Sequence, residues 1–249
     1  MKLLIVKSMD IKISLEGLTT SVIGPSNSGK TYFLKKLCNK IDNQDIIIDG
    51  ISIKLLDINY LKRNLAVVLD DDIFNTNSVR GELSFYLKKL NYSGKEIKER
   101  LKEFKDYFKL DDIYKKSIFD LTLEKKVLIK ILALLIIKPK IFAVDNLLGY
   151  LSKEYQSLVF KYIKESGMNF INITSNPEDL LRSDNVVVLN AFKAIYCDSA
   201  ESLVVGNSIL PYMGIKMPFI ADLSQNLILY GLIDKVYLDR RKLVDKLWK

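Results

Sequence analysis

Short apolar runs recur along this chain, and in its first fifty residues they are brief and closely spaced. They lie at residues 3–6, 11–15, 21–23 and 45–48. Such runs, separated by polar and glycine-containing turns, are typical of β-strands. The last of them ends in Asp49-Gly50, a dipeptide that favours a two-residue hairpin. We therefore expect a β-rich start with antiparallel pairing.

Beyond residue 60 the apolar runs alternate with segments of helical periodicity. Strands are predicted at residues 65–69, 141–144, 169–173 and 185–189. Ser93 and Glu96 form a capping-box pattern, and the helix that follows carries an apolar stripe of Ile97, Leu101, Phe104 and Phe108. Residues 123–137 predict a long apolar helix that ends before Pro139. Strands alternating with helices indicate an α/β fold whose mostly parallel sheet is covered on both faces.

A phosphate-binding motif follows the predicted strand at residues 21–23. The motif G-x-x-x-x-G-K-S/T is matched in full by Gly24, Pro25, Ser26, Asn27, Ser28, Gly29, Lys30 and Thr31. A helical segment comes next, so the motif has the strand–loop–helix context that it requires. Backbone N–H groups and the helix N-terminus would surround phosphate oxygens. Lys30 would contact the β- and γ-phosphates, and the Thr31 hydroxyl would ligate Mg²⁺.

Two further positions bear on this predicted site. Asn27 stands where many such loops have glycine, and asparagine tolerates left-handed backbone better than most residues. Asp145 ends the apolar run at residues 141–144, which is a Walker B pattern. We expect Asp145 to hold Mg²⁺ through the ion's water shell.

Composition excludes several kinds of chemistry. The chain of 249 residues has no histidine, which rules out a histidine general base, a Ser-His-Asp triad and a histidine-ligated zinc site. Its two cysteines, Cys38 and Cys197, lie far apart without metal-ligand spacing and are predicted to be inert thiols. The net charge of +8 fits a solvated surface, an anionic membrane face or a nucleic acid, and charge alone does not choose among them.

Nothing in the sequence predicts a membrane span or a signal peptide. The longest apolar stretch, residues 131–137, is far short of the roughly 20 residues that cross a bilayer. The apolar run near the start has no cleavage site. We therefore expect a cytoplasmic chain.

With these motifs in place, the chain resembles the ATPase subunits of ABC transporters, and more specifically those of energy-coupling factor (ECF) importers of vitamins and metal ions. Residues 121–139 have the spacing of the family's signature helix, and residues 78–87 are similar to its segment after the Q-loop. Residues 211–219, 223–231 and 240–247 resemble its C-terminal domain. The resemblance covers nearly the whole chain.

This resemblance implies a P-loop NTPase fold of the ABC-ATPase type, with a mostly parallel core sheet, an N-terminal antiparallel part and a helical subdomain. The nucleotide-binding domain would span residues 1–205, with the helical subdomain at about 78–138. Residues 206–249 would form a small C-terminal helical extension. This extension either packs against the sheet edge or contacts a dimer partner. The resemblance also implies ATP with Mg²⁺ as the bound ligand.

Several positions depart from the family pattern. Asp70 stands at the Q-loop Gln, Asn146 at the catalytic Glu, and Ser175 at the switch His. The signature, L-S-G-G-Q in the family, is here Leu121, Thr122, Leu123, Glu124 and Lys125. An amide cannot accept a proton from water as a carboxylate does, and serine cannot bear the charge of a protonated histidine. We therefore expect the chain to bind MgATP and to hydrolyse it slowly or not at all.

The aromatic residue that stacks on adenine is also missing from its usual place upstream of the phosphate loop. No Phe, Tyr or Trp precedes Tyr32. By analogy with base–aromatic stacking elsewhere, about 1–3 kcal/mol of binding free energy would be absent.

The resemblance implies partners as well. ABC ATPases act as head-to-tail homo- or heterodimers, in which each ATP lies between the phosphate loop of one subunit and the signature of the other. It further implies a transmembrane coupling subunit, docked on the surface around residues 70–87, and a substrate-binding membrane subunit. The chain would then lie at the inner face of the cell membrane, as the ATP-binding subunit of an ABC/ECF-type importer.

Two other functions stay open. One is a non-hydrolysing nucleotide-binding regulator or scaffold. The other is a nucleic-acid-linked ABC protein, but such proteins carry a long coiled coil or tandem ABC domains. This chain has one phosphate loop and no sustained heptads, so no nucleic-acid partner is expected.

Overall fold

The computed structural model describes residues 2–206 and 208–248. Its strands are β1 (Leu3–Val6), β2 (Ile11–Ser14), β3 (Thr19–Ile23), β4 (Ile46–Ile48), β5 (Ile51–Ser52), β6 (Leu65–Val68), β7 (Ile141–Asp145), β8 (Asn169–Ile173), β9 (Asn185–Asn190) and β10 (Lys193–Ser199). Its α-helices are α1 (Lys30–Leu37), α2 (Ile58–Asn64), α3 (Val79–Lys89), α4 (Gly94–Tyr107), α5 (Leu123–Leu135), α6 (Lys153–Glu165), α7 (Ala200–Gly206), α8 (Ile209–Tyr212), α9 (Phe219–Leu229) and α10 (Arg240–Leu247). Short 3-10 helices are η1 (Lys7–Met9), η2 (Ile53–Leu55), η3 (Ile118–Asp120), η4 (Leu148–Tyr150) and η5 (Pro177–Arg182).

The strands form two sheets. The larger has the order β10-β9-β3-β8-β7-β6, and its neighbours are parallel except for β10, which runs antiparallel to β9. The smaller has the order β2-β1-β4-β5 and is antiparallel throughout. A turn at Asp49-Gly50 joins β4 to β5. The predicted combination of a mostly parallel core sheet and an N-terminal antiparallel part is confirmed.

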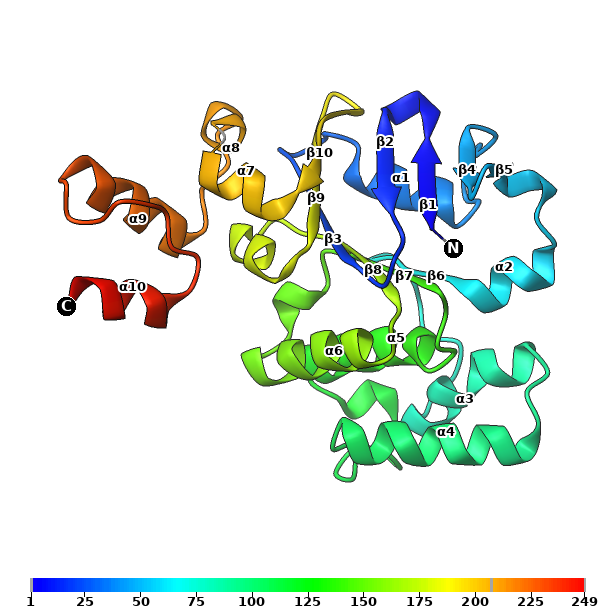
Figure 1. Cartoon of the computed structure of the whole chain (residues 1–249). Helices are drawn as coiled ribbons and strands as arrows, with labels where there is room; N and C mark the ends of the chain where they lie inside the picture. Colours follow the sequence, from blue (N-terminus) through cyan, green and yellow to red (C-terminus); the bar gives the residue numbers. More distant parts are fainter. Residues whose placement is uncertain (1, 207, 249) are drawn as a thin grey trace.

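Both faces of the larger sheet are buried, and β7 shows how. Phe142 and Val144 belong to one apolar cluster, which includes residues of α3, α5 and α6. Ile141 and Ala143 belong to a second cluster, formed with the small sheet and α1. Figure 1 shows α5 and α6 on one side of the sheet and α1 with the small sheet on the other. Because successive side chains of a strand point to opposite faces, an uninterrupted apolar run is what a strand covered on both faces requires.

The helical part at residues 78–138 begins with α3, which packs against α4 and α5. The capping box predicted at Ser93 is present, with Ser93 and Glu96 bonding reciprocally across the first turn of α4. The apolar stripe of α4 faces the core, where Phe104 and Phe108 are fully buried. The long apolar helix predicted at residues 123–137 is α5, whose side chains cover the sheet.

The prediction omitted β10, the antiparallel edge strand. Its side chains are exposed or half-buried almost throughout, and it carries Lys193 and Asp198. An edge strand of this kind lacks the continuous apolar run by which the buried strands were recognised. Its pairing with β9 depends on the hairpin turn at Ala191 and Phe192, both of which have positive φ.

The C-terminal part consists of short helices, as predicted, and extends to one side of the molecule (Figure 1). Leu210 and Ala221 join a cluster with side chains of β3, β9 and α7. Ile220, Ile233 and Leu243 form a separate small cluster. The predicted boundary at residue 205 falls inside α7, and the domain division itself stays a prediction. Within the described residues, no helix is long and apolar enough to span a bilayer.

Candidate nucleotide-binding site

The phosphate loop connects β3, which ends at Ile23, to α1, which begins at Lys30. Asn27 has φ of 61° and Gly29 has φ of 103°. Both values lie in the left-handed region that asparagine tolerates and that glycine adopts readily. Asparagine at the usual glycine position is therefore compatible with the turn of the loop.

Close approach of other backbone explains the first glycine of the loop. A Cβ at Gly24 would lie 2.3 Å from the Leu189 carbonyl oxygen and 2.6 Å from the Ser28 hydroxyl. No side chain fits at those distances, so the loop and the end of β9 pack together only with glycine at this position.

Lys30 points its ammonium into the loop. Its Nζ donates to the carbonyl oxygens of Gly24 and Pro25, both at 2.7 Å, and to the Ser28 hydroxyl at 3.3 Å. Burial lowers the pKa of Lys30, and the negative charge of Asp145 opposes this shift. A partly desolvated cation at the centre of a loop of backbone amides favours an anionic ligand.

The two residues predicted to hold Mg²⁺ come together. The Thr31 hydroxyl, on the first turn of α1, lies close enough to the Asp145 carboxyl at the end of β7 to lower its pKa by hydrogen bonding. Asp145 is only 4% exposed. A hydroxyl and a carboxylate fit a Mg²⁺ ion, which takes few protein ligands and completes its octahedron with water and phosphate oxygens. Within residues 2–206 and 208–248, no group of three or more His, Cys, Asp or Glu side chains is arranged so that it could hold a metal ion.

Asp145 is costly to ionise when no cation is bound. Burial raises the pKa of Asp145, and the charges of Asp70 and Asp71 raise it further, while the Thr31 hydrogen bond and Lys30 oppose the rise. A raised carboxyl pKa means that the folded chain binds this proton more tightly than the unfolded chain does. The free energy of unfolding therefore falls as the pH rises through the unfolded and then the folded pKa of Asp145.

We predict that Asp145→Asn raises the melting temperature of the nucleotide-free chain at pH 7 and removes the Mg²⁺ dependence of ATP binding. The stabilisation follows because the amide removes the buried charge, and it should shrink as the pH falls below the pKa of an ordinary aspartate. Thermal melts from pH 3.5 to 8, with and without MgATP, check both effects. Asp42→Asn is the control, since Asp42 is exposed, its pKa is lowered by Lys54, and its charge does not act on Asp145. A lower melting temperature for Asp145→Asn at pH 7 would contradict the prediction.

Asn146 and Ser175, which are predicted to stand at the family's catalytic Glu and switch His positions, lie in contact. The Asn146 side-chain oxygen accepts a hydrogen bond from the Ser175 backbone N–H at 3.2 Å. The Asn146 N–H donates to the Ile173 carbonyl oxygen at 3.0 Å, which ties the ends of β7 and β8 together. Both residues are exposed. Neither a neutral amide nor a hydroxyl acts as a base near pH 7.

Asp70 begins an acidic run directly after the β6 strand and Leu69. The Asp70 backbone carbonyl accepts from Lys130 Nζ at 2.8 Å, while its charge acts on Asp145. The next two carboxylates are partly neutralised by lysines, since Asp71 lies 3.4 Å from Lys35 and Asp72 lies 2.9 Å from Lys40. Asp70 is the residue predicted at the family's Gln position, and its charge, like that of Asp71, acts on Asp145 at the predicted Mg²⁺ site.

The signature residues form a second group, at the start of α5. Thr122 caps the helix by accepting from the Lys125 N–H at 3.4 Å, and Leu121 is buried. Leu123 is 64% exposed. These residues lie on the opposite face of the sheet from α1 (Figure 1). Within one chain the structure therefore does not join the signature to the phosphate loop.

The side chains of Glu124 and Lys125 are engaged within the chain. Glu124 accepts from the Ser152 N–H at 2.9 Å, at the cap of α6. Lys125 bonds to the Tyr155 hydroxyl and lies 3.8 Å from Asp112. The carboxylate of Glu124, which is predicted to stand at a family glycine position, is thus hydrogen-bonded to a backbone N–H.

Sequence reasoning missed Phe192, which lies against the phosphate loop from the turn between β9 and β10. Its backbone N–H donates to the Ser28 carbonyl oxygen at 2.9 Å. Its ring meets the Tyr32 ring edge to face, with centroids 5.3 Å apart. The sequence carries no signal for this turn, because Ala191 and Phe192 stand where asparagine and glycine are usual. Nothing in the sequence indicates the contact with residue 28.

Comparison with known proteins identifies the family. The model of the ABC transporter family matches residues 6–148, more than half of the chain. The ECF transporter ATP-binding protein EcfA1 of Oenococcus oeni is 25% identical over 244 residues, covering 94% of this chain and 88% of that protein. A putative ABC transporter ATP-binding protein of Clostridium acetobutylicum is 25% identical over 237 residues, covering 90% and 85%.

Solved structures agree on the fold. The structure of cbiO1 from Clostridium perfringens, described as part of the ABC transporter complex cbiONQ, superposes with a TM-score of 0.69. It is 20% identical and covers 88% of this chain and 92% of its own. A dimeric bacterial ABC transporter cassette gives a TM-score of 0.65 at 19% identity, covering 77% and 89%. The phosphate loop, the Thr31–Asp145 pair and these matches agree, and the chain therefore belongs to the ABC transporter family and has the ABC-ATPase fold.

Proposed function

We propose that this chain is the ATP-binding subunit of an ABC importer of the energy-coupling factor type. It binds MgATP at an interface with a second ATPase subunit, and its own hydrolytic site is impaired. The observation that carries the proposal is the assembled phosphate site, in which Lys30 lies inside the loop and Thr31 bonds to Asp145. The ECF type is supported by the names of relatives that match over nearly their whole length.

In the bound state each residue has a defined task. Backbone N–H groups of the loop bind phosphate oxygens, and Lys30 Nζ exchanges its carbonyl partners for the β- and γ-phosphates. Thr31 and Asp145 hold the metal, which neutralises phosphate charge when it is bound. The metal would then place a positive charge beside the buried Asp145 carboxylate and favour its ionised form.

The proposal of impaired hydrolysis is supported by the residue types that meet at the Asn146–Ser175 contact, since neither of them is a general base. Attack on the γ-phosphate needs a group that orients water and accepts its proton, and loss of a general base costs typically 10²–10⁴-fold in rate. The Asn146 oxygen already accepts a hydrogen bond from the chain and has no charge to offer. The charge of Asp70 acts on Asp145, the predicted metal ligand.

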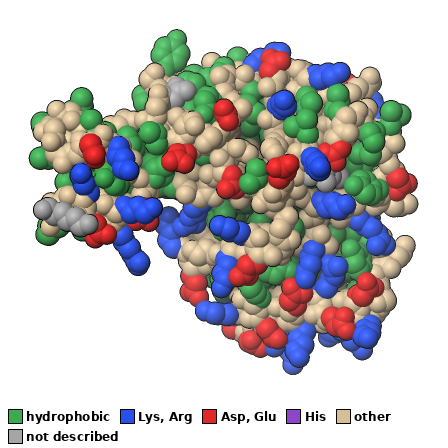
Figure 2. Space-filling model, in the orientation of Figure 1, with side chains coloured by type: hydrophobic (Ala, Val, Ile, Leu, Met, Phe, Trp, Pro, Cys, Tyr) green, Lys and Arg blue, Asp and Glu red, His purple; other side chains and the backbone are tan. Residues whose placement is uncertain are grey.

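A second ATPase subunit completes the site. The exposed start of α5, with Thr122 and Leu123, would face the phosphate loop of the partner, because it lies on the other side of the sheet from the chain's own loop. The C-terminal extension also offers an apolar surface, visible on the left of Figure 2. Its exposed large side chains include Tyr212, Phe219, Leu229, Tyr230 and Leu232. We propose contact with the partner ATPase as the role of this surface.

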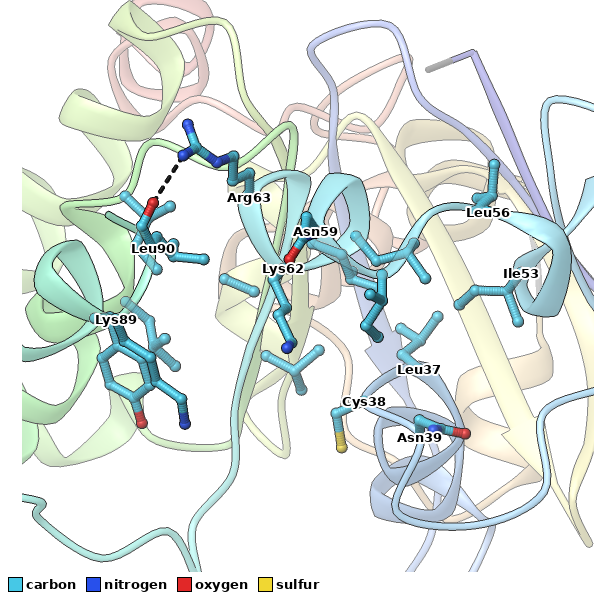
Figure 3. A pocket seen from close by; sticks show the side chains of 18 of the residues that line it. Leu37, Cys38, Asn39, Ile53, Leu56, Asn59, Lys62, Arg63, Lys89 and Leu90 are labelled. Atoms are coloured by element: carbon cyan, nitrogen blue, oxygen red, sulfur yellow. Dashed lines mark hydrogen bonds between the residues drawn. The ribbon is translucent and has the colours of Figure 1, made fainter. Parts of the chain in front are cut away.

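A membrane subunit would dock at a cavity of about 900 Å³ between the end of α1, α2, β6 and α3. Figure 3 shows its lining, in which Lys89 lies on one side, Lys62 in the middle, and the apolar Leu37 and Leu56 on the other side. Arg63 closes one side by donating to the Leu90 carbonyl oxygen at 2.7 Å. This basic groove, lined by apolar and basic side chains, suits one amphipathic helix with acidic flanks. The net charge of +8 would favour the anionic inner face of a membrane.

The first test is MgATP binding and hydrolysis by the purified chain at several protein concentrations. Binding without turnover is the expected result, and absence of binding would refute the proposal. Turnover at the rate of ordinary ABC ATPases would refute the impaired site, and would mean that Asp70 or a neighbouring acid replaces the base.

A regulator or scaffold that binds nucleotide without hydrolysis would share this site, and the same Asn146–Ser175 contact favours it. The two functions differ at the basic groove. Co-purification with an integral membrane protein in detergent, lost in a Lys62→Glu/Lys89→Glu variant that still binds ATP, supports the importer. A chain that binds ATP and associates with no membrane protein is the regulator.

A further inference from the structure

Two large aromatic side chains stand half-exposed beside the phosphate loop. Tyr32 follows Thr31 on the first turn of α1 and is 41% exposed. Phe192, from the turn between β9 and β10, is 48% exposed. Their rings make an edge-to-face pair at 5.3 Å and 87°. Apolar rings left open at the rim of a polar loop call for a ligand with an apolar face.

The backbone at Phe192 is strained. Ala191 has φ of 44° and Phe192 has φ of 63°, in a region that asparagine and glycine populate and bulky residues avoid. The turn is nevertheless joined to the phosphate loop by the bond from the Phe192 N–H to the Ser28 carbonyl oxygen. Strain of this kind concentrates at functional sites, and here its effect is to set an aromatic ring over the loop.

The ring lies directly against Gly29. A Cβ added there would be 2.9 Å from Cδ1 of Phe192 and 3.3 Å from the methyl carbon of Met9. Met9 is 1% exposed and packs against the loop at this position. The ring of Phe192 therefore packs against Gly29, the residue that precedes Lys30.

Tyr32 also contacts a buried lysine. The ammonium of Lys36 lies 5.6 Å from the centre of the Tyr32 ring. Lys36 is itself 4% exposed and is fixed by an ion pair with Asp45 and a 2.9 Å bond to the Ser8 hydroxyl. The two rings are thus held in place by contacts with each other and with Lys36.

We propose that Phe192, supported by Tyr32, is the surface on which the base of the bound nucleotide stacks. The inference rests on the proposed function, because it needs a nucleotide in the loop. Lys30 and Thr31 hold the terminal phosphates, and Tyr32 comes next on the same helical turn, so the nucleoside end lies within reach of the pair. Aromatic stacking accepts any base, since every base has a π-face. The hairpin would then supply the stacking aromatic that the sequence lacks upstream of the loop.

The test compares ligands with and without a base. Phe192→Gly removes the ring and places at this position the residue that tolerates its φ, so the fold should be at least as stable. We expect its affinity for ATP to fall about 5- to 150-fold, the equivalent of one base–aromatic stack. Its affinity for inorganic triphosphate should not change. Phe192→Tyr keeps the aromatic face and should bind ATP like the wild type. Phe119→Ala, an exposed aromatic on η3, is the matched control.

The outcomes separate this inference from the proposed function. A wild-type chain that binds neither ATP nor triphosphate overturns the proposed function. A wild-type chain that binds ATP, with Phe192→Gly binding it equally well, overturns only the stacking role. Equal loss of ATP and triphosphate in Phe192→Gly also overturns it, because the ring would then shape the loop instead. Thermal unfolding of Phe192→Gly at or above the wild-type temperature shows that the variant is folded.

Discussion

Replacing Lys30 by alanine is expected to lower ATP affinity by about 100-fold or more. The ammonium donates to three oxygen atoms of the loop in the nucleotide-free chain, and a phosphate would take over these charge-assisted hydrogen bonds, each stronger than a neutral one. Since burial lowers the pKa of Lys30, losing this charge should not destabilise the empty chain. Calorimetric titration with MgATP, together with thermal melts, measures both quantities.

The matched control is Lys35→Ala on the same helix. Lys35 is half-exposed, and its ammonium lies 3.4 Å from the exposed Asp71 carboxylate, so its removal should leave ATP affinity within a few-fold of the wild type. ATP binding that persists in Lys30→Ala would show that residues 24–31 do not form the phosphate site.

Restoring the two missing catalytic groups is expected to raise ATP turnover. In Asn146→Glu/Ser175→His a carboxylate and an imidazole would stand at two positions that already touch. Recovery of a general base is worth about 10²–10⁴-fold in rate. Glutamate at the left-handed φ of 53° found at Asn146 costs roughly 1–2 kcal/mol of stability. The variant should therefore have a lower melting temperature and a higher rate of ATP hydrolysis than the wild type. Phosphate release at several protein concentrations measures the gain.

The comparison variant for this experiment is Asn146→Gln/Ser175→His, which has the length of glutamate without its charge and should show no gain. If the glutamate variant binds ATP and its turnover stays at the wild-type level, the missing base is not what limits hydrolysis. The acidic Asp70 or the altered signature around Glu124 would then be the limiting feature.

Local patterns predicted the elements whose burial is continuous. Strands β7 and β8 are buried at every position, because helices cover one face of the sheet and the small antiparallel sheet covers much of the other. The phosphate loop was predicted for a different reason. Its glycines, its lysine and the flanking strand and helix are contiguous in sequence, so the motif carries its own geometry.

Contacts between distant segments were beyond the reach of such patterns. Strand β10 is an edge strand with mixed polarity, and Phe192 meets the phosphate loop across more than 160 residues of sequence. Nor does the sequence show that Glu124 turns to the Ser152 N–H. The partner of a side chain depends on which distant segment the fold brings beside it, and local periodicity contains no information on that.

For this protein, the sequence by itself determined the α/β architecture, the phosphate loop and the chemical identity of the groups at each family position, including the absence of histidine. These follow from local backbone preferences, from burial on two sheet faces and from side-chain chemistry. The tertiary structure alone decided which of these groups meet. It brings Thr31 to Asp145, Asn146 to Ser175 and Phe192 to the loop, because parallel strands deliver their carboxyl ends to one edge of the sheet and the β9–β10 hairpin turns back over it.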